Sequence, residues 1–279
     1  MSYKSMLTVL TDPAEVQAVL RAAIPLATEA GAHLDVLCLG IDRTQTGYYF
    51  AGATALMHDE TIVQAQAEAA EIETAARAEL GRGDLSWGLE ALVAQSASVA
   101  GLVARRARFA DLVILPKPYG EGRYSDAPVV VEAAMFQGQA PVVVLAEDAP
   151  LTSKPKRVVV AWNESSEAMA AIRRALPMLQ AAGDVNVCII APERHSSESS
   201  DPGAELSKML SRHGVKVEVS ILPQTLPRVS EVIARHVEDT GADMLVMGAY
   251  GHSRFREAIL GGATRSMLEH ASVPVFMAH

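Results

Sequence analysis

The chain has little of what several classes of protein require. It contains only two cysteines, Cys38 and Cys188, and both stand inside apolar runs, so we expect buried free thiols rather than a disulfide framework. Its formal net charge of -9 argues against a nonspecific nucleic-acid binder, because such proteins need a positive field that attracts phosphates. No apolar run approaches the roughly 18 residues of a membrane span.

Two further absences bear on location and chemistry. The opening stretch MSYKSMLTVLTD has neither the basic nor the apolar segment of a secretory signal peptide, so we predict a cytoplasmic protein that does not bind membranes. The eight histidines show no H-E-x-x-H motif and no Cys–His cluster, which predicts that no metal is bound by such a site. The order of serines, histidines and acids does not predict a catalytic triad either.

What the sequence does contain is an internal repeat. A chain of 279 residues, 49% of them hydrophobic, is long enough for two domains with substantial cores. In the alignment of the two copies Cys38 meets Cys188. Three pairs of segments match in the same order: AAIPLATEAG (22–31) with RALPMLQAAG (174–183), ADLVILPKPYG (110–120) with ADMLVMGAYG (242–251), and APVVVLA (140–146) with VPVFMAH (273–279). We therefore predict two tandem modules, 1–148 and 155–279, joined by a polar linker that contains proline.

Within each module, short apolar runs alternate with longer amphipathic segments. Most of the runs are apolar on successive residues, as expected for strands that are covered on both faces. Strands alternating with helices predict parallel pairing through right-handed crossovers, hence an α/β fold of two doubly wound modules. In the second module we predict strands at 157–162, 185–191, 215–221, 243–247 and 274–278, and helices at 164–182, 204–213, 226–241 and 262–271.

The stretch MGAYGHSRFREAILGGAT (247–264) concentrates glycines between a predicted strand and a predicted helix. Any one of these glycines is explained by an ordinary turn. The spacing of Gly248, Gly251 and Gly261, G-x2-G-x9-G, favours a second explanation. Glycines leave backbone amides uncovered, and the unpaired N–H groups and dipole at the start of a helix attract an anion such as phosphate. The stretch is neither a Walker loop nor a G-x-G-x-x-G motif.

This stretch closely resembles the nucleotide-binding signature of the universal stress protein family, G-x2-G-x9-G-[ST], and EHASVPVFMAH (269–279) resembles the usual end of that family. The resemblance covers the whole chain as two tandem modules. It implies a five-stranded, Rossmann-like parallel sheet in each module, and a stress-response protein that binds ATP or another adenine nucleotide. It also implies the site residues: Ala161, Asn163 and Ile190 at the adenine and ribose, Met247 and Gly248 flanking the base and ribose, and Gly251, Gly261, Gly262, Ala263 and Thr264 around the phosphates.

Two positions depart from the family pattern. Asn163 stands where the family usually has an aspartate, so a hydrogen-bond acceptor remains without its charge. Gly262 stands where a serine or threonine is usual, and it keeps the amide but loses a hydroxyl. One neutral hydrogen bond contributes about 1 kcal/mol, so we expect binding that is several-fold weaker rather than absent.

His252 and Arg254, between the motif glycines, either neutralise phosphates or belong to a solvated loop.

The first module differs at the equivalent turn, LPKPYGEGRYSDAPVVVEAAM (115–135). It has Pro116 and Tyr119 in place of the two leading glycines, and prolines 116 and 118 lack the amide donors that a phosphate would use. A serine or aspartate in SDAP (125–128) is expected to cap the helix that follows. We predict that this module does not hold a triphosphate and that it packs against the second module.

The sequence leaves three functional hypotheses open. The first is a binding and regulatory protein that senses an adenine nucleotide through its second module, since no catalytic nucleophile or metal site is recognisable. The second is a weak ATPase that uses bound Mg²⁺, for which His252 is the candidate base. The third is a binder of a different small anionic or apolar metabolite. The resemblance to the universal stress protein family also implies that the last strands of the two modules pair within the chain. Association into a homodimer stays open, because a long apolar edge invites pairing.

Overall fold

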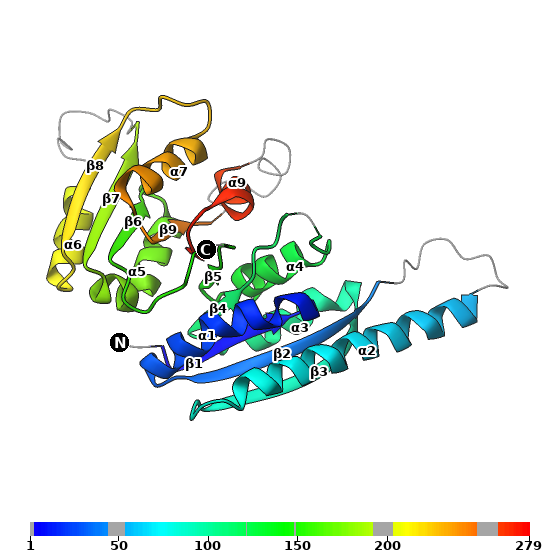
Figure 1. Cartoon of the computed structure of the whole chain (residues 1–279). Helices are drawn as coiled ribbons and strands as arrows, with labels where there is room; N and C mark the ends of the chain where they lie inside the picture. Colours follow the sequence, from blue (N-terminus) through cyan, green and yellow to red (C-terminus); the bar gives the residue numbers. More distant parts are fainter. Residues whose placement is uncertain (1–2, 44–53, 121, 148, 192–202, 250–261) are drawn as a thin grey trace. The chain divides into compact units, whose positions relative to one another are not determined.

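The computed structural model describes residues 3–43, 54–120, 122–147, 149–191, 203–249 and 262–279. These residues form two compact units, Tyr3–Ala140 and Pro141–His279. In each unit, helices cover both faces of a sheet that is wholly or mostly parallel (Figure 1). None of the described helices is long and apolar enough to cross a membrane.

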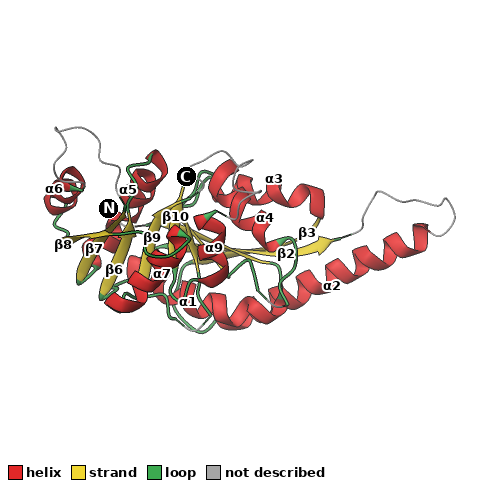
Figure 2. Ribbon diagram, turned by 90° about the horizontal axis from the view of Figure 1, so that it is seen from above, coloured by secondary structure: helices red, strands yellow, loops and turns green. Residues whose placement is uncertain are grey.

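The first unit is a four-stranded parallel sheet with the strand order β3-β2-β1-β4. Its elements are β1 (Ser5–Leu10), the 3-10 turn η1 (Pro13–Glu15), α1 (Val16–Ala30), β2 (His33–Asp42), α2 (Thr54–Leu80), β3 (Trp87–Gln95), α3 (Ser96–Ala107), β4 (Leu112–Leu115), α4 (Ala127–Glu132) and the π-helical turn η2 (Ala133–Gln137). Figure 2 shows α1 and α2 on one side of these strands and α3 and α4 on the other. Successive residues of β1 are buried from Met6 onward, so both faces are covered, as the apolar run predicted.

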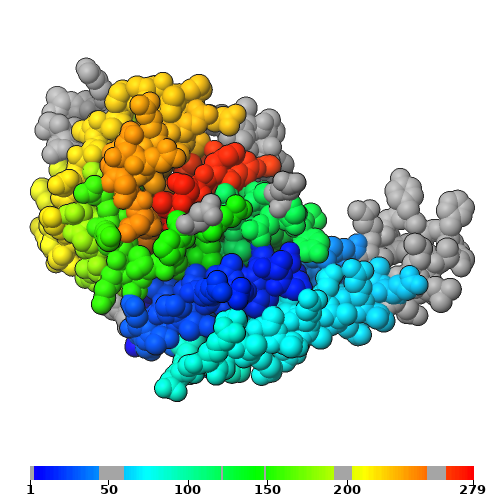
Figure 3. Space-filling view, viewed as in Figure 1, coloured from blue at the N-terminus to red at the C-terminus, as the bar shows by residue number. Residues whose placement is uncertain are grey.

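Helices α1 and α2 lie side by side on the same face of the first unit's sheet, α1 in blue and α2 in cyan in Figure 3. The alanine-rich helix α2 presents small side chains to the sheet: Ala65, Ala69 and Ala76 are each at most 5% exposed. Small residues on the buried face let the backbone of α2 lie close to β2.

The second unit has a mixed sheet with the strand order β5-β10-β9-β6-β7-β8. Its elements are β5 (Val142–Val144), β6 (Arg157–Ala161), α5 (Ser166–Ala181), β7 (Asp184–Ile190), α6 (Ala204–Arg212), β8 (Val217–Leu222), α7 (Val229–Thr240), β9 (Met244–Gly248), α9 (Ala263–His270) and β10 (Val275–Ala278). Every strand and helix predicted for the second module is present, with ends that differ by at most a few residues. All neighbouring strands from β10 to β8 run parallel, which confirms the doubly wound α/β prediction.

The strand β5 is the one antiparallel member among the described strands of this sheet. It pairs with β10 in the register Val142↔Met277 and Val144↔Val275, and these residues are buried. The predicted pairing of the two last strands within one chain is therefore confirmed. The sequence repeat ends after β5, near residue 148, whereas the structural unit begins before β5, because the hydrogen bonds of β5 to β10 place it in the second unit.

The duplication is visible in hydrogen bonds as well as in topology. In the first unit the carboxylate of Asp111 accepts the backbone N–H groups of Lys4 and Ser5. In the second unit the carboxylate of Asp243 accepts those of Lys156 and Arg157. The aspartate before β4 and the aspartate before β9 thus fix the start of the neighbouring central strand in the same way. The alanine–aspartate pair seen in both sequence copies has a structural cause.

These anchors correct one detail of the repeat alignment. Ser5 and Arg157 occupy equivalent places, and from them the strand registers place Leu37 opposite Val9 and Cys188 opposite Ala161. Leu37, rather than Cys38, is therefore the counterpart of Cys188. The difference of one residue arises because the segment between the first two strands is one residue longer in the first unit than in the second. Both cysteines are buried and free, as predicted.

Candidate functional site

The strand order of the second unit reverses direction between β6 and β9. From β6 the chain proceeds through α5 to β7 and through α6 to β8, on one side of β6. It then returns through α7 to β9 and through α9 to β10, on the other side. The helices of the two halves lie on opposite faces, so their connections separate at the carboxyl ends of β6 and β9. A crevice for a ligand is expected at this point.

The end of β6 forms one wall of the expected crevice. Ala161 is the register partner of both Cys188 and Met247, so it lies between β7 and β9. Beyond it, Asn163 is exposed, and its Oδ1 accepts the N–H of Ser165 at 3.3 Å. The hydroxyl of Ser165 in turn accepts the N–H of Ala168 at 3.1 Å and caps α5. The side chain of Asn163 therefore stands fixed at the carboxyl edge of the sheet.

The other wall is the end of β9, where Gly248 makes a close approach possible. A Cβ atom at this position would lie 2.4 Å from the backbone N of Ala168 and 2.7 Å from the carbonyl carbon of Glu167. The first turn of α5 therefore rests directly on the backbone of β9, which only glycine permits. Met247, one residue earlier, is 6% exposed. Gly248 thus has a packing role that the sequence motif did not reveal.

The helix α9 begins on the far side of β9. Gly262 stands at its N-cap with φ -59 and ψ 161, a backbone conformation open to any residue, and no side chain caps the helix there. Gly262 and Ala263 are half-buried, and Thr264 is 3% exposed. The predicted residues Gly251, Gly261, His252 and Arg254 lie outside the described residues.

The structure places five of the predicted residues at the ends of three adjacent strands, β9, β6 and β7. Ala161, Asn163, Met247 and Gly248 stand at the ends of the adjacent strands β6 and β9. Ile190 ends the next strand, β7, where its register partner is Leu222 of β8. It lies two residues beyond Cys188, the partner of Ala161, and is half-buried. In the described part of the chain, no three His, Cys, Asp or Glu residues form a group that could hold a metal ion.

The corresponding edge of the first unit carries charged side chains that sequence reasoning missed. Arg123, in the loop after β4, forms an ion pair with Glu15 of η1. Arg43, directly after β2, donates through Nε to Asp126 at 2.8 Å. No spacing in the sequence marks these pairs, because their members are far apart along the chain. The predicted helix cap was wrong: Asp126 stands at the N-cap of α4, but its side chain makes no capping hydrogen bond and accepts one from Arg43 instead.

The comparison with protein families bears on the second unit. Residues 154–279 match the model of the Universal stress protein family. The second unit is a universal stress protein domain. The curated Universal stress protein Slr1230 of Synechocystis sp. (strain ATCC 27184 / PCC 6803 / Kazusa) is 41% identical over 68 residues, which are 24% of this chain and 23% of that protein. The chain thus aligns with about a quarter of the length of this relative.

Solved structures resemble the chain over nearly its whole length. A universal stress protein from Archaeoglobus fulgidus DSM 4304 has a TM-score of 0.63 and 18% identity, and the match covers 98% of this chain and 95% of that one. A putative universal stress protein from Pseudomonas aeruginosa UCBPP-PA14 has a TM-score of 0.56 and 15% identity, over 99% of this chain and 93% of that one. At these identities the likeness is one of fold, and it extends beyond the universal stress protein domain to the first unit.

Proposed function

We propose that the second unit binds an adenine nucleotide, with ATP as the first candidate, and that the chain acts in the stress response as a nucleotide-dependent regulatory protein. The observation that carries the proposal is the position of the residues expected at the base and ribose. Ala161 and Asn163 end β6, Met247 and Gly248 end β9, and these strands flank the switch point of a universal stress protein domain.

The charges of the described residues favour one orientation of the nucleotide. The start of α5 carries two acids, Glu164 and Glu167, which would repel phosphates. The first turn of α9 carries no acid, and its exposed Arg265 is basic. Both helices present the positive end of their dipole at this edge, but Ser165 caps α5, whereas no side chain caps α9. We therefore place the phosphates toward α9 and the base toward β6 and β7.

The first experiment identifies the ligand. Protein purified without added nucleotide is denatured by heat, and the released small molecules are analysed by mass spectrometry. An adenine nucleotide at up to one equivalent per chain supports the proposal. A different anion or an apolar metabolite as the retained ligand would replace it with the third hypothesis. Mg²⁺-dependent release of phosphate from added ATP would favour the weak ATPase over a purely binding role.

The second experiment measures affinity and location together. The chain has two tryptophans, Trp87 in the first unit and Trp162 beside Asn163, so the Trp87→Phe variant leaves one reporter next to the proposed site. Titration with ATP should change the fluorescence of Trp162 and saturate at one nucleotide per chain. Two equivalent sites per chain would contradict the assignment of binding to the second unit alone.

A matched pair of variants at Gly262 tests the phosphate position. Its φ of -59 and ψ of 161 suit proline as well as alanine, but only proline removes the amide donor. A hydrogen bond to a charged group contributes about 1.5–3 kcal/mol, so Gly262→Pro should weaken ATP binding roughly 10- to 100-fold. Gly262→Ala keeps the amide and should bind nearly as the parent does. Equal affinity of the two variants for ATP would show that the phosphates do not bind at the amide of Gly262.

A further inference from the structure

In the first unit, the loop after β4 is tied to the ends of two other strands. Arg123 forms an ion pair with Glu15, which belongs to η1 directly after β1. Three residues later, Asp126 accepts from Nε of Arg43, which directly follows β2, at 2.8 Å. We call residues 122–126 the strap. Because its two charged residues are bound to the segments that follow β1 and β2, the strap crosses the carboxyl edge of the sheet.

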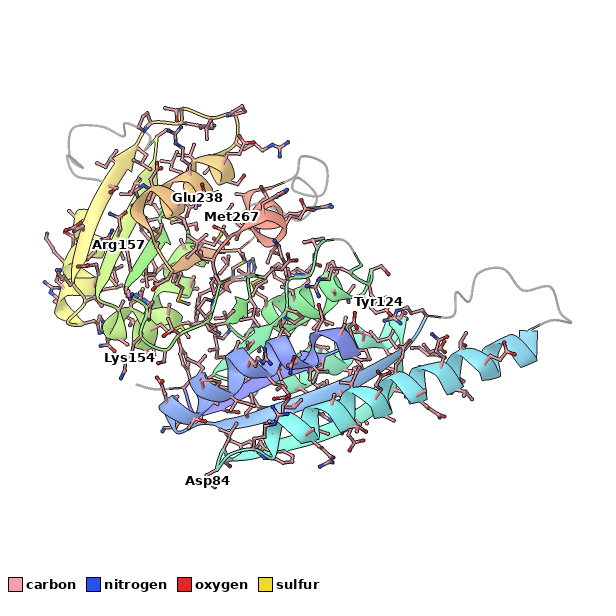
Figure 4. All side chains as sticks on the ribbon, viewed as in Figure 1. Asp84, Tyr124, Lys154, Arg157, Glu238 and Met267 are labelled. Atoms are coloured by element: carbon pink, nitrogen blue, oxygen red, sulfur yellow. The ribbon has the colours of Figure 1, made fainter. Side chains whose placement is uncertain are left out.

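Both ion pairs of the strap are shielded from solvent. The two carboxylate side chains are 9% and 11% exposed, and the two arginine side chains 22% and 29%. The guanidinium of Arg43 also lies 3.4 Å from the carboxylate of Glu68 on α2 and 3.9 Å from the ring centre of Tyr124. Figure 4 labels Tyr124 on the strap, near the end of β2. Shielded pairs of this kind are screened weakly by salt, and breaking one leaves an uncompensated charge.

We propose that the strap is a built-in cover of the first unit's crevice, in which the carboxylates of Glu15 and Asp126 take the place of a ligand's anionic groups. The crevice of a doubly wound sheet lies at the carboxyl ends of its central strands, here β1 and β4, and the strap runs across that edge. The two arginines there receive their counter-charges from within the chain. An outside anion has to displace a tethered carboxylate before it binds. This assignment concerns the first unit and does not rest on the ligand of the second.

Hydrogen exchange of the full-length chain tests whether the strap is held by its ion pairs. We expect the amides of residues 122–126 to exchange at least about tenfold faster in Arg123→Gln than in the parent, because local opening no longer breaks a buried ion pair. Arg123→Lys, which keeps the charge, should retain most of the protection. Arg82→Gln is the control, because Arg82 is 67% exposed in its pair with Glu79 and should leave the strap unchanged.

The amides of β1 report whether the fold of the first unit survives each substitution. Where Arg123→Gln also accelerates exchange in β1, Asp126→Asn replaces it, with the same expected loss of protection confined to the strap. A strap that exchanges in the parent as fast as an unprotected peptide overturns the proposal. So does a strap whose exchange is unchanged by both substitutions.

The second arm tests whether the two carboxylates stand in for a ligand. In the double variant Glu15→Gln/Asp126→Asn, Arg123 loses Glu15 and Arg43 loses Asp126, while Arg43 keeps its contact with Glu68. We use inorganic pyrophosphate as the probe. Added pyrophosphate should slow the exchange of the strap amides in the double variant by about tenfold and leave the parent strap unchanged. Because exchange is measured at the strap amides of the first unit, this effect is distinguished from pyrophosphate binding in the second unit. Pyrophosphate that leaves the strap of the double variant unchanged would show that the carboxylates only stabilise the loop, and the stand-in role falls.

Discussion

Replacing Gly248 by alanine separates two roles that one glycine could have. The Cβ of alanine would lie 2.4 Å from the N of Ala168 and 2.9 Å from its Cα, and these are backbone atoms of α5 that no rotamer change can move. Ordinary carbon contacts begin near 3.5 Å, so the first turn of α5 must retreat by about 1 Å. Overpacking of this kind costs about 1–3 kcal/mol, and we expect about 3 kcal/mol here because a whole helix has to shift.

The assay for Gly248→Ala follows the second unit alone. In the Trp87→Phe background, the fluorescence of Trp162 reports unfolding of the unit that contains it. A loss of about 3 kcal/mol in a unit of this size corresponds to a fall in the unfolding midpoint of about 10 °C. Gly262→Ala is the control in the same unit, because the φ of -59 and ψ of 161 at Gly262 suit alanine, and its midpoint should match the parent.

The opposite result for Gly248→Ala would refute the packing argument. If the variant unfolds at the parent's temperature but binds ATP more weakly, the packing of α5 tolerates the added Cβ. Glycine would then be needed at position 248 for contact with the ligand. If both stability and affinity fall, affinity has to be measured well below the unfolding midpoint of the variant. There, a retained affinity would assign Gly248 to packing alone.

Three further predictions concern other parts of the molecule. Gly262→Ser restores the hydroxyl usual in the family, and the φ of -59 accommodates serine, so we expect ATP to bind about fivefold tighter in a fluorescence titration. His236 has its Nε2 2.8 Å from Oδ1 of Asn186, and burial lowers its pKa. The stability that depends on the neutral imidazole is therefore complete above pH about 6.5 and is lost as the pH falls below that value. Urea midpoints at pH 7.5 and 5.5 should therefore differ by less in His236→Gln than in the parent. Desolvation raises the pKa of Cys38 to about 12 and that of Cys188 to about 11, so neither thiol should react with a thiol reagent at pH 8 faster than the protein unfolds.

The sequence was sufficient for those parts of the fold that depend on local patterns. Apolar runs gave the strands, and the order of strands and helices gave the doubly wound topology. The placement of Asn163 at the end of β6 and of Gly248 at the end of β9 followed from the same patterns. These features depend on hydrophobic periodicity within short segments, which a single sequence displays directly.

Features that depend on contacts between distant segments could not be predicted. The residues next to Gly248 in the sequence do not indicate that α5 packs against it, because Ala168, which contacts it in space, is distant along the chain. The ion pair between Arg43 and Asp126 likewise joins residues 83 positions apart, and it removes the carboxylate that local pattern assigned to a helix cap. An aspartate before a helix is a good cap in isolation, but a half-buried arginine competes for it more strongly, since a hydrogen bond between two charged groups contributes more than one to a neutral donor.

The two units show how one scaffold supports two different edges. Strand registers place Pro116 of the first unit at the position of Gly248 in the second. In the second unit this glycine lets α5 begin at Ser166 and rest on β9. In the first unit a proline at this position cannot offer the same bare backbone, and the 3-10 turn η1 precedes α1. That turn carries Glu15, which binds the strap. The change from glycine to proline therefore goes together with a change at this edge, from the nucleotide site that we propose for the second unit to the strap of the first.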